Sequence, residues 1–331
     1  MKILICTNYY YYGDPRIADP WFSAFTSIPR QMGHEVHFLD HYAQARINKE
    51  MFNDFFLSTI KHGGYDLVLI VLTQEEFRPE ILEEAKKYTT LVGWNSDDDW
   101  RWEDYSKKWY PYFTNMITTY RHIYEAHKQN YPNLILSQWA CPGFYDGSKV
   151  PKDIDFSFVG LTYGERGQQI RQINKHLPLL TFGRSTPATN LPLKKRIKRT
   201  IANLCRIPYE DNALSGPKEV NGTWNRSKIT FTPLRASHGP GLQIKGRVFE
   251  MGLSGTVMLC DLNPALDEFY TRNQEYMDYT SLEECIEKAR WLLAHETERQ
   301  KISTAYYDRT RKEHLWEHRF KKIFADLNLP Q

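Results

Sequence analysis

The chain has 331 residues, 25% of them charged, and a formal net charge of +3. This length predicts two domains, and so small a net charge neither requires nor excludes a nucleic-acid partner. Hydrophobic residues make up 41% of the chain, as in globular proteins, and no apolar stretch has the length of a signal peptide or a membrane span. The five scattered cysteines contain no CxxC pair, which favours reduced thiols in the cytoplasm and disfavours a zinc site.

The first half alternates short apolar runs with helical patterns. Strands are predicted at 2–7, 34–40, 65–72, 91–94, 116–119 and 134–139, and helices at 21–32, 49–61, 79–88 and 123–130. This alternation is typical of an α/β domain with a doubly wound parallel sheet, here over residues 1–148.

The loop after the first strand contains Asp14 and Arg16. It lies at the carboxyl end of that strand, where ligands bind in open α/β sheets. Asp14 and Arg16 are therefore candidates to face a cleft, although a solvated turn would explain them as well.

A Pro- and Gly-containing stretch at 141–153 reads as a linker, after which the strand–helix alternation restarts. Strands are predicted at 154–159, 179–182, 229–231 and 257–260, and helices at 168–176, 281–295 and 298–326. Residues 184–220 give no clear pattern, apart from a basic amphipathic segment near their centre.

The stretch 239–261 combines a glycine loop, two basic residues and a short helix. Lys245 and Arg247 precede or open the helical pattern, Glu250 lies about one turn further in, and Gly252 and Gly255 are expected to break it. A helix N-terminus after a glycine loop offers free N–H groups and a positive dipole end, which suit a phosphate. The alternative is an ordinary surface helix with a solvated glutamate.

Several stretches resemble the CgeB-like group-1 glycosyltransferases of the GT-B superfamily. They are TWNRSKITF, VFEMGLSGTVMLCD, EYMDYTSLEECIEKARWLL and RTRKEHLWEHRFKKI. The resemblance implies a GT-B fold, with two Rossmann-like doubly wound domains facing a central cleft. Residues 1–148 would form the acceptor-side domain and 149–312 the nucleotide-sugar domain, while 313–331 would form a helix that crosses back to the first domain.

The resemblance also implies the activity. The chain is expected to move a sugar from a UDP- or GDP-sugar to a glycan, lipid-linked glycan, protein or modified DNA base, with retention and without a metal or other cofactor. Glu250 matches the acid that binds the ribose hydroxyls. The other donor-binding candidates are Arg247, Lys245, Gly239, Gly241, Tyr163, Gly164, Arg166 and Arg235, the acceptor-side candidates are Asp14 and Arg16, and the catalytic candidates are His238, Asp98 and Asp99.

One departure concerns the donor loop. Related retaining enzymes carry a second glutamate eight positions before the first, where this chain has Leu242, and His238 or a backbone amide is the candidate to replace that acid. Two other functions therefore stay open: a non-catalytic module that binds sugar nucleotides or glycans, and a sugar-nucleotide epimerase of the same fold.

Two charged clusters allow more than one interpretation. The acids Asp97, Asp98 and Asp99 follow a strand and could bind Mg²⁺, act on an acceptor hydroxyl as a base, or cap a helix. The basic residues Lys194, Lys195, Arg196, Lys198 and Arg199 could be a solvated helix face, a contact to an anionic membrane surface, or a contact to DNA.

Overall fold

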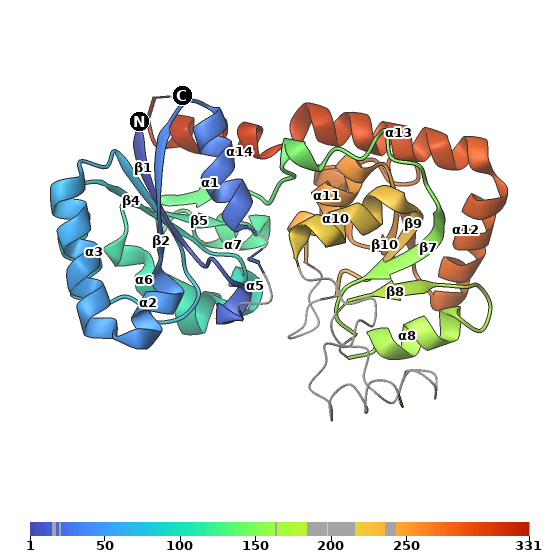
Figure 1. The fold of residues 1–331 in the computed structure, drawn as a ribbon, viewed down its shortest axis with the longest axis horizontal. Helices are drawn as coiled ribbons and strands as arrows, with labels where there is room; N and C mark the ends of the chain where they lie inside the picture. Colours follow the sequence, from blue (N-terminus) through green and yellow to red (C-terminus); the bar gives the residue numbers. More distant parts are fainter. Residues whose placement is uncertain are drawn as a thin grey trace. The chain divides into compact units, whose positions relative to one another are not determined.

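The chain divides into two compact units (Figure 1). The computed structural model describes residues 1–14, 18–19, 21–162, 164–183, 197, 216–235 and 243–330. Unit 1 comprises Met1–Pro142 and Leu315–Gln331, and unit 2 comprises Gly143–His314. The sequence analysis places these boundaries after residues 148 and 312.

The described part of unit 1 contains a six-stranded sheet in the order β2-β1-β3-β4-β5-β6. Each strand pair in it is parallel, and β3 is buried at every position, as expected for a sheet covered on both faces. The main elements of this unit are β1 (Lys2–Thr7), α1 (Phe22–Gln31), β2 (Glu35–Asp40), α2 (His41–Ile47), α3 (Lys49–Gly63), β3 (Leu67–Val71), α4 (Pro79–Ala85), β4 (Thr90–Trp94), α5 (Asp98–Arg101), α6 (Lys107–Trp109), β5 (Asn115–Thr118), α7 (Arg121–His127), β6 (Leu134–Leu136) and α14 (Trp316–Asp326).

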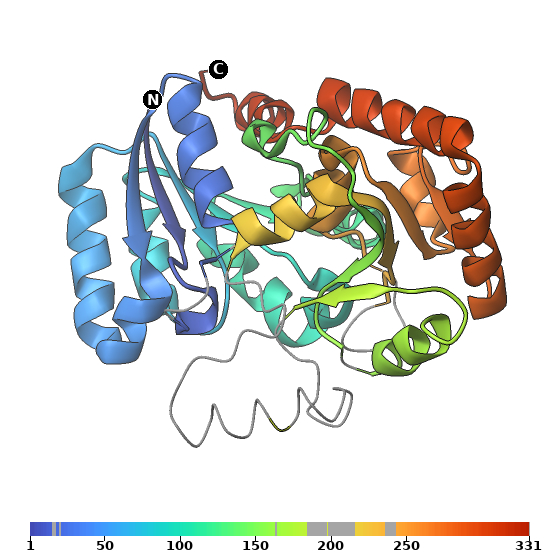
Figure 2. The ribbon, with the colours of Figure 1, turned by 45° about the vertical axis from the view of Figure 1, so that its right-hand side comes forward.

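Helices cover both faces of this sheet. On one face, α3 and α4 bury Phe52, Phe56 and Leu82 in a cluster that includes Leu4 and Val68 of the strands. On the other face, α14 lies beside α1 (Figures 1 and 2). The last helix of the chain therefore belongs to the core of the first unit.

The aromatic side chains of α14 make this attachment. The buried Trp316 ring lies 4.9 Å from the Phe25 ring of α1 and 5.7 Å from the Trp94 ring of β4, measured between centroids. Further along the helix, Phe320 lies 6.0 Å from Phe25. Large rings bury much apolar area, so this contact contributes strongly to the stability of unit 1.

The prediction of one helix over 298–326 is wrong. The structure has two helices, α13 (Glu296–Glu313) and α14, separated by His314 and Leu315. Leu315 is extended, with φ −83° and ψ 156°, and forms a parallel bridge with Cys141, whose carbonyl accepts the N–H of Trp316 at 3.1 Å. This backbone pairing cannot be made by a continuous helix.

The described part of unit 2 contains a five-stranded parallel sheet in the order β11-β10-β9-β7-β8. The strand β11 was not predicted, because it has only three residues and one of them is Asp278. The main elements of this unit are β7 (Ile154–Val159), α8 (Arg166–Ile173), β8 (Leu180–Phe182), α10 (Pro217–Arg226), β9 (Ser227–Thr232), α11 (Gly246–Ser254), β10 (Val257–Asp261), β11 (Met277–Tyr279), α12 (Leu282–Ala294) and α13.

Unit 2 is layered in the same way. One face of its sheet packs on α8 and α12, whose Ile170, Ile173 and Leu292 join the core cluster with Phe156 and Phe231 of the strands. Figure 1 shows α10 and α11 on the opposite side of the sheet, with α13 running past α11. The prediction of two Rossmann-like parallel α/β domains is confirmed.

Gly252 does not end its helix as predicted. The helix α11 continues through Gly252 to Ser254, and Gly255 ends it in the left-handed conformation with φ +66°. A Cβ on Gly252 would collide with the Thr310 hydroxyl of α13 and touch the Tyr306 ring. Gly252 therefore faces Thr310 and Tyr306 of α13, and its lack of a side chain permits the close packing of α11 on α13.

Of the cysteines that the structure describes, Cys6, Cys141, Cys260 and Cys285 are buried and form no disulfide. Within the described ranges, no helix combines the length and the apolar character that crossing a bilayer requires.

We expect Gly252→Ala to destabilise the protein by about 1–3 kcal/mol, because the added methyl group overpacks the contact between α11 and α13. Gly222→Ala is the matched control, since Gly222 also lies in a helix but its Cβ would meet nothing within 4 Å. That control should be neutral or stabilising by up to about 1 kcal/mol through helix propensity. Urea unfolding measures both, and equal midpoints for the two variants would contradict the packing argument.

Candidate functional site

The topology of unit 2 marks one edge of its sheet as a binding edge. The strand β7 lies between β8 and β9, so the chain continues in opposite directions from β7 to its two neighbours. In open α/β sheets, ligands bind at the carboxyl ends of the strands where the strand order reverses. The loops that follow β7 and β9 are therefore the first place to look for a site.

The loop after β9, Pro233–Arg235, is held from three sides. Leu234 donates its N–H to Asp261 Oδ2 at 2.8 Å and accepts the N–H of Gln243 at 2.9 Å. The guanidinium of Arg166, at the start of α8, donates to the carbonyls of Pro233 at 3.2 Å and Arg235 at 3.0 Å. These bonds give the loop a fixed shape at the edge of the sheet.

A recess with an empty volume of about 240 Å³, partly open to solvent, lies against this loop. Its lining residues come from the starts of α8 and α11 and from the β9 loop. They are Arg166, Pro233, Leu234, Arg235, Gln243, Lys245 and Arg247. Most of these residues are cationic, and Glu165 is the acid that pairs with Arg235, at 3.6 Å between exposed side chains. The recess therefore suits an anionic ligand.

Two glycines shape the backbone at the end of β7, near Arg247. Gly160, which follows β7, has φ +154°, and the place of a Cβ on it lies 3.5 Å from Arg247 Nη1. Gly183, which follows β8, has φ +138° and packs so tightly on the Gly160 carbonyl that a Cβ there would overlap it. Side chains at these positions would be strained, and one at Gly183 would also collide with the Gly160 backbone.

Glu250 lies within α11, one turn beyond Arg247, and is 8% exposed. Burial raises the pKa of its carboxyl to about 7, and the charge of Arg247 lowers it by a smaller amount. Among the described residues, no side chain or N–H donates a hydrogen bond to this carboxylate. It can therefore accept hydrogen bonds from a ligand, which would stabilise its charged form.

The helix α11 is anchored at its far end and along its side. The ammonium of Lys152 donates to the carbonyls of Ser254, at the end of α11, and Asn225, at the end of α10, at 2.6 and 2.7 Å. The Tyr306 hydroxyl of α13 donates to the carbonyl of Val248 in the first turn of α11. The cations at the start of α11 and Glu250 are thus carried by a rigid element.

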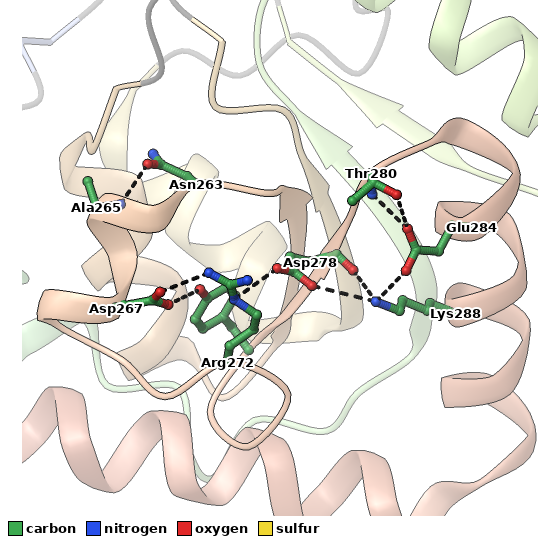
Figure 3. A network of polar contacts seen from close by, with 9 residues as sticks. Asn263, Ala265, Asp267, Arg272, Asp278, Thr280, Glu284 and Lys288 are labelled. Carbon is green, nitrogen blue, oxygen red and sulfur yellow. Dashed lines mark hydrogen bonds and ion pairs between the residues drawn. The ribbon is translucent and has the colours of Figure 1, made fainter.

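A polar network lies on the far side of β10, around β11 and α12 (Figure 3). Asp278 is 6% exposed and pairs with Arg272 at 3.1 Å and Lys288 at 3.5 Å, while Lys288 pairs with Glu284 at 2.8 Å. The Glu284 carboxylate also accepts two hydrogen bonds from Thr280, each of 2.7 Å. Since these charges neutralise one another, we interpret the network as structural.

The acidic candidates in unit 1 do not converge. Asp97 precedes α5 without a capping hydrogen bond from its side chain. Asp98 is fully buried, which raises its pKa to about 6, while the nearby hydroxyls of Ser106 and Thr118 lower it. The Asp99 carboxylate lies 3.1 Å from His122 Nε2. Asp98 and Asp99 thus have separate surroundings, and no group of three or more His, Cys, Asp or Glu in the described ranges is arranged to hold a metal.

The remaining candidates divide into two sets. Gly164, with φ +56°, lies in the loop before α8, and Asp14 follows a short 3-10 turn in unit 1. The others fall outside the described residues, and they are Arg16, Tyr163, Lys194, Lys195, Arg196, Lys198, Arg199, His238, Gly239, Gly241 and Leu242.

Some residues that shape the recess were not predicted from the sequence. Asp261 was not among the candidates, although it directly follows the strand predicted at 257–260, and a carboxylate at the carboxyl end of a strand is a signal for a role in bracing a site. Gln243 carries no such signal, because it acts through its backbone N–H. Gly160 and Gly183 could have been noticed, since each directly follows a predicted strand.

Comparison with protein families gives one match. The family model described as Glycosyl transferase-like matches residues 191–325, which cover the greater part of unit 2 and most of α14. No curated protein matches the chain. The prediction of a glycosyltransferase domain is confirmed by this match.

Comparison with solved structures identifies the fold. An alpha-glucosyltransferase in complex with UDP-glucose and DNA containing an abasic site has a TM-score of 0.65 at 14% identity. Alr3699/HepE of Anabaena in complex with UDP-glucose has 0.64 at 11%, and sucrose-phosphate synthase of Thermosynechococcus elongatus has 0.61 at 10%. Each comparison covers 99% of both chains. The fold is that of the GT-B glycosyltransferases, and together with the family match it supports glycosyltransferase activity.

The pKa of Glu250 predicts how stability depends on pH. Because the folded protein holds this proton more tightly than the ordinary pKa of 4.5 allows, the free energy of unfolding should fall as the pH rises from about 4.5 to 7. The free energy of unfolding should change by about 3 kcal/mol in total between these two pH values. In Glu250→Gln this fall in the free energy of unfolding should be absent. The stability of the variant relative to the wild type should therefore increase as the pH rises.

Urea unfolding of the wild type and Glu250→Gln at pH 5 and pH 8 measures this. Parallel changes in the two proteins would show that Glu250 titrates normally.

Proposed function

We propose that the protein is a glycosyltransferase that moves a sugar from a nucleoside diphosphate sugar to the hydroxyl group of an acceptor. The observation that carries this proposal is the cationic recess at the β7/β9 reversal point of a GT-B fold. A diphosphate requires cations and N–H donors, and this edge of the sheet provides both.

In this proposal unit 2 binds the donor. Arg247, Lys245, Arg235 and Arg166 hold the diphosphate, with Arg166 acting mainly by fixing the β9 loop. Glu250 accepts hydrogen bonds from the ribose hydroxyls. Of the residues outside the described ranges, Tyr163, Gly239 and Gly241 join the donor site, and Gly164 shapes the loop before α8. A UDP-sugar is the first donor to test, since similar structures were solved with UDP or UDP-glucose.

The chemistry follows from these charges. The bond between the sugar carbon and the diphosphate oxygen breaks, the acceptor oxygen takes its place, and the acceptor proton leaves with the diphosphate or a nearby base. Arg247, Lys245 and the first N–H groups of α11 stabilise the charge on the departing diphosphate, a role that needs no metal. His238, Asp98 and Asp99 are our candidates for catalytic groups. Retention of configuration rests on the family resemblance.

We propose unit 1 as the acceptor-side domain, with Asp14 and Arg16 on that side, and the CgeB-like group as the branch to which the chain belongs. A cytoplasmic location agrees with the free thiols of the described cysteines. One structure of similar fold contains DNA, so DNA stays among the acceptors to test, together with an anionic membrane surface, through Lys194, Lys195, Arg196, Lys198 and Arg199.

The direct test is a thermal-shift panel of UDP, GDP, CDP and dTDP and their sugars, with and without Mg²⁺. One nucleotide should raise the apparent melting temperature by mass action, with no need for Mg²⁺. Product analysis then separates the functions: transfer to an acceptor supports the proposal, conversion of the donor alone indicates an epimerase, and binding without turnover indicates a binding module. No shift with any nucleotide would refute the donor site.

We expect Arg247→Gln to weaken binding of the preferred nucleoside diphosphate about tenfold or more, because it removes a charge-assisted contact of about 1.5–3 kcal/mol. Arg226→Gln is the matched control: Arg226 is an exposed arginine of the same unit, at the amino end of β9, where it pairs with Asp153. Isothermal titration measures both. Equal affinities in the two variants would place the diphosphate elsewhere.

A further inference from the structure

Unit 1 has the same reversal of strand order as unit 2. Its strand β1 lies between β2 and β3, as β7 lies between β8 and β9. The carboxyl end of β1 is therefore the equivalent binding edge. The residues that follow β1 differ in chemistry from those of the recess in unit 2.

Two exposed aromatic rings stand at this edge. Tyr9 and Tyr10, which we call the tyrosine shelf, follow the end of β1 and are 44% and 37% exposed. The Tyr9 ring packs edge-on against Phe22 at 4.8 Å and against Tyr10 at 4.7 Å between centroids. Large exposed rings that are held in place by other rings are typical of sites that stack on a ligand.

The backbone of the shelf is also fixed. The N–H of Tyr9 donates to Asp40 Oδ2 at 3.1 Å, and its carbonyl accepts the N–H of Asp19 at 3.0 Å. Tyr10 forms an antiparallel bridge with Ala18. The shelf is thus a preorganised surface, which lowers the entropy lost when a ligand binds.

Hydrogen-bonding groups without partners lie next to the shelf. Asn8 is 7% exposed, and its Oδ1 has no partner among the described residues. The same holds for both ring nitrogens of His41, which is fully buried. Asn8 and His41 directly follow Thr7 and Asp40, a register pair of β1 and β2. Buried polar groups are rarely left unpaired in proteins, so this pair of neighbours indicates a missing partner.

More such groups continue along the same edge. Asn95 Nδ2 follows β4, Thr119 Oγ1 follows β5, and Ser137 Oγ follows β6, and each is buried and lacks a partner in the described ranges. All three are uncharged and lie at the carboxyl ends of adjacent strands. The edge thus offers neutral hydrogen-bonding groups in a row.

The charges near the shelf disfavour an anionic ligand. Asp19 and Asp40 both bond to the backbone around it, and burial raises the pKa of Asp19 to about 7. The described residues of the loop, 8–14 and 18–19, include no lysine or arginine, while Arg16 of the same loop lies outside the described residues. The described cation of the neighbouring helix α2, Arg46, donates to the Tyr42 hydroxyl. A phosphate or DNA backbone would meet carboxylates here.

We propose that the tyrosine shelf and Asn8 bind an uncharged sugar, which is the acceptor of the reaction. The assignment as acceptor rests on the proposed function, whereas the binding of a sugar does not. The apolar face of a sugar ring stacks on Tyr9 and Tyr10, and its hydroxyls bond to the Asn8 amide. Among the candidate acceptors, the proposed site therefore favours a carbohydrate over a nucleic acid.

Saturation-transfer NMR tests this with the full chain and the methyl glycosides of glucose, galactose, mannose and N-acetylglucosamine. At least one glycoside should bind, with the strongest transfer to one face of its ring. Tyr10→Ala should weaken it about tenfold, the loss of one stacked ring. Asn8→Ala should weaken it as well. Tyr10 is the better variant of the shelf, because Tyr9 also packs on Phe22 and Phe38.

The matched control is Tyr88→Ala. Tyr88 is 47% exposed and lies just before β4, at the opposite edge of the same sheet, so its removal should leave glycoside binding unchanged. The proposal is overturned if no glycoside binds, if Tyr10→Ala and Asn8→Ala bind as the wild type does, or if glucose 6-phosphate or a short DNA duplex binds more tightly than every glycoside.

The UDP thermal shift, measured on the same variants, separates this proposal from the proposed function. A retained UDP shift with lost glycoside binding supports the shelf as a separate site. Glycoside binding without a thermal shift by any nucleotide would support the tyrosine shelf as a sugar site and refute the proposed glycosyltransferase function.

Discussion

The contact between α11 and α13 is the constraint on which the recess of unit 2 depends. Helix α11 carries the cations Lys245 and Arg247 at one end and Glu250 in its middle, so any rotation of this helix would move all three together. Gly252 lets α13 come close enough for Tyr306 to bond to the backbone of the first turn, and Lys152 holds the last turn. At the strand ends, Gly183 packs directly on the backbone of Gly160, which lies beside Arg247. The recess is thus defined by absent side chains as much as by present ones.

The two units share one strand topology but differ in the groups that follow the central strand. In unit 2 the loops present guanidinium and ammonium groups around a braced backbone. In unit 1 they present phenol rings and amides, with carboxylates bonded to the backbone. The same reversal of strand order, in a six-stranded and a five-stranded sheet, therefore provides two surfaces of different charge. This difference is general in folds in which the loops contact the ligand and the strands form the scaffold.

Local patterns in the sequence were sufficient for most strands and for the cations of α11. Buried parallel strands are continuous apolar runs, as in Leu67–Val71. Lys245, Arg247 and Glu250 lie within two helical turns of one another in the sequence. Long-range contacts were not predictable. Nothing near Gly252 in the sequence indicates Thr310, and nothing near Leu315 indicates its pairing with Cys141. The hydroxyls that lower the pKa of Asp98 likewise come from Ser106 and Thr118, which belong to other elements.

The attachment of α14 to unit 1 gives the chain a nested order. Unit 2 is continuous in sequence, whereas unit 1 is assembled from a first segment and a last one. A ribosome therefore completes all of unit 2 before it supplies the helix that covers Phe25 and Trp94. Domains usually fold in the order of their synthesis, and here the later unit can be finished first. Until Trp316 emerges, α1 lies on this face of the sheet without its partner helix, and the surfaces of Phe25 and Trp94 that Trp316 contacts remain uncovered.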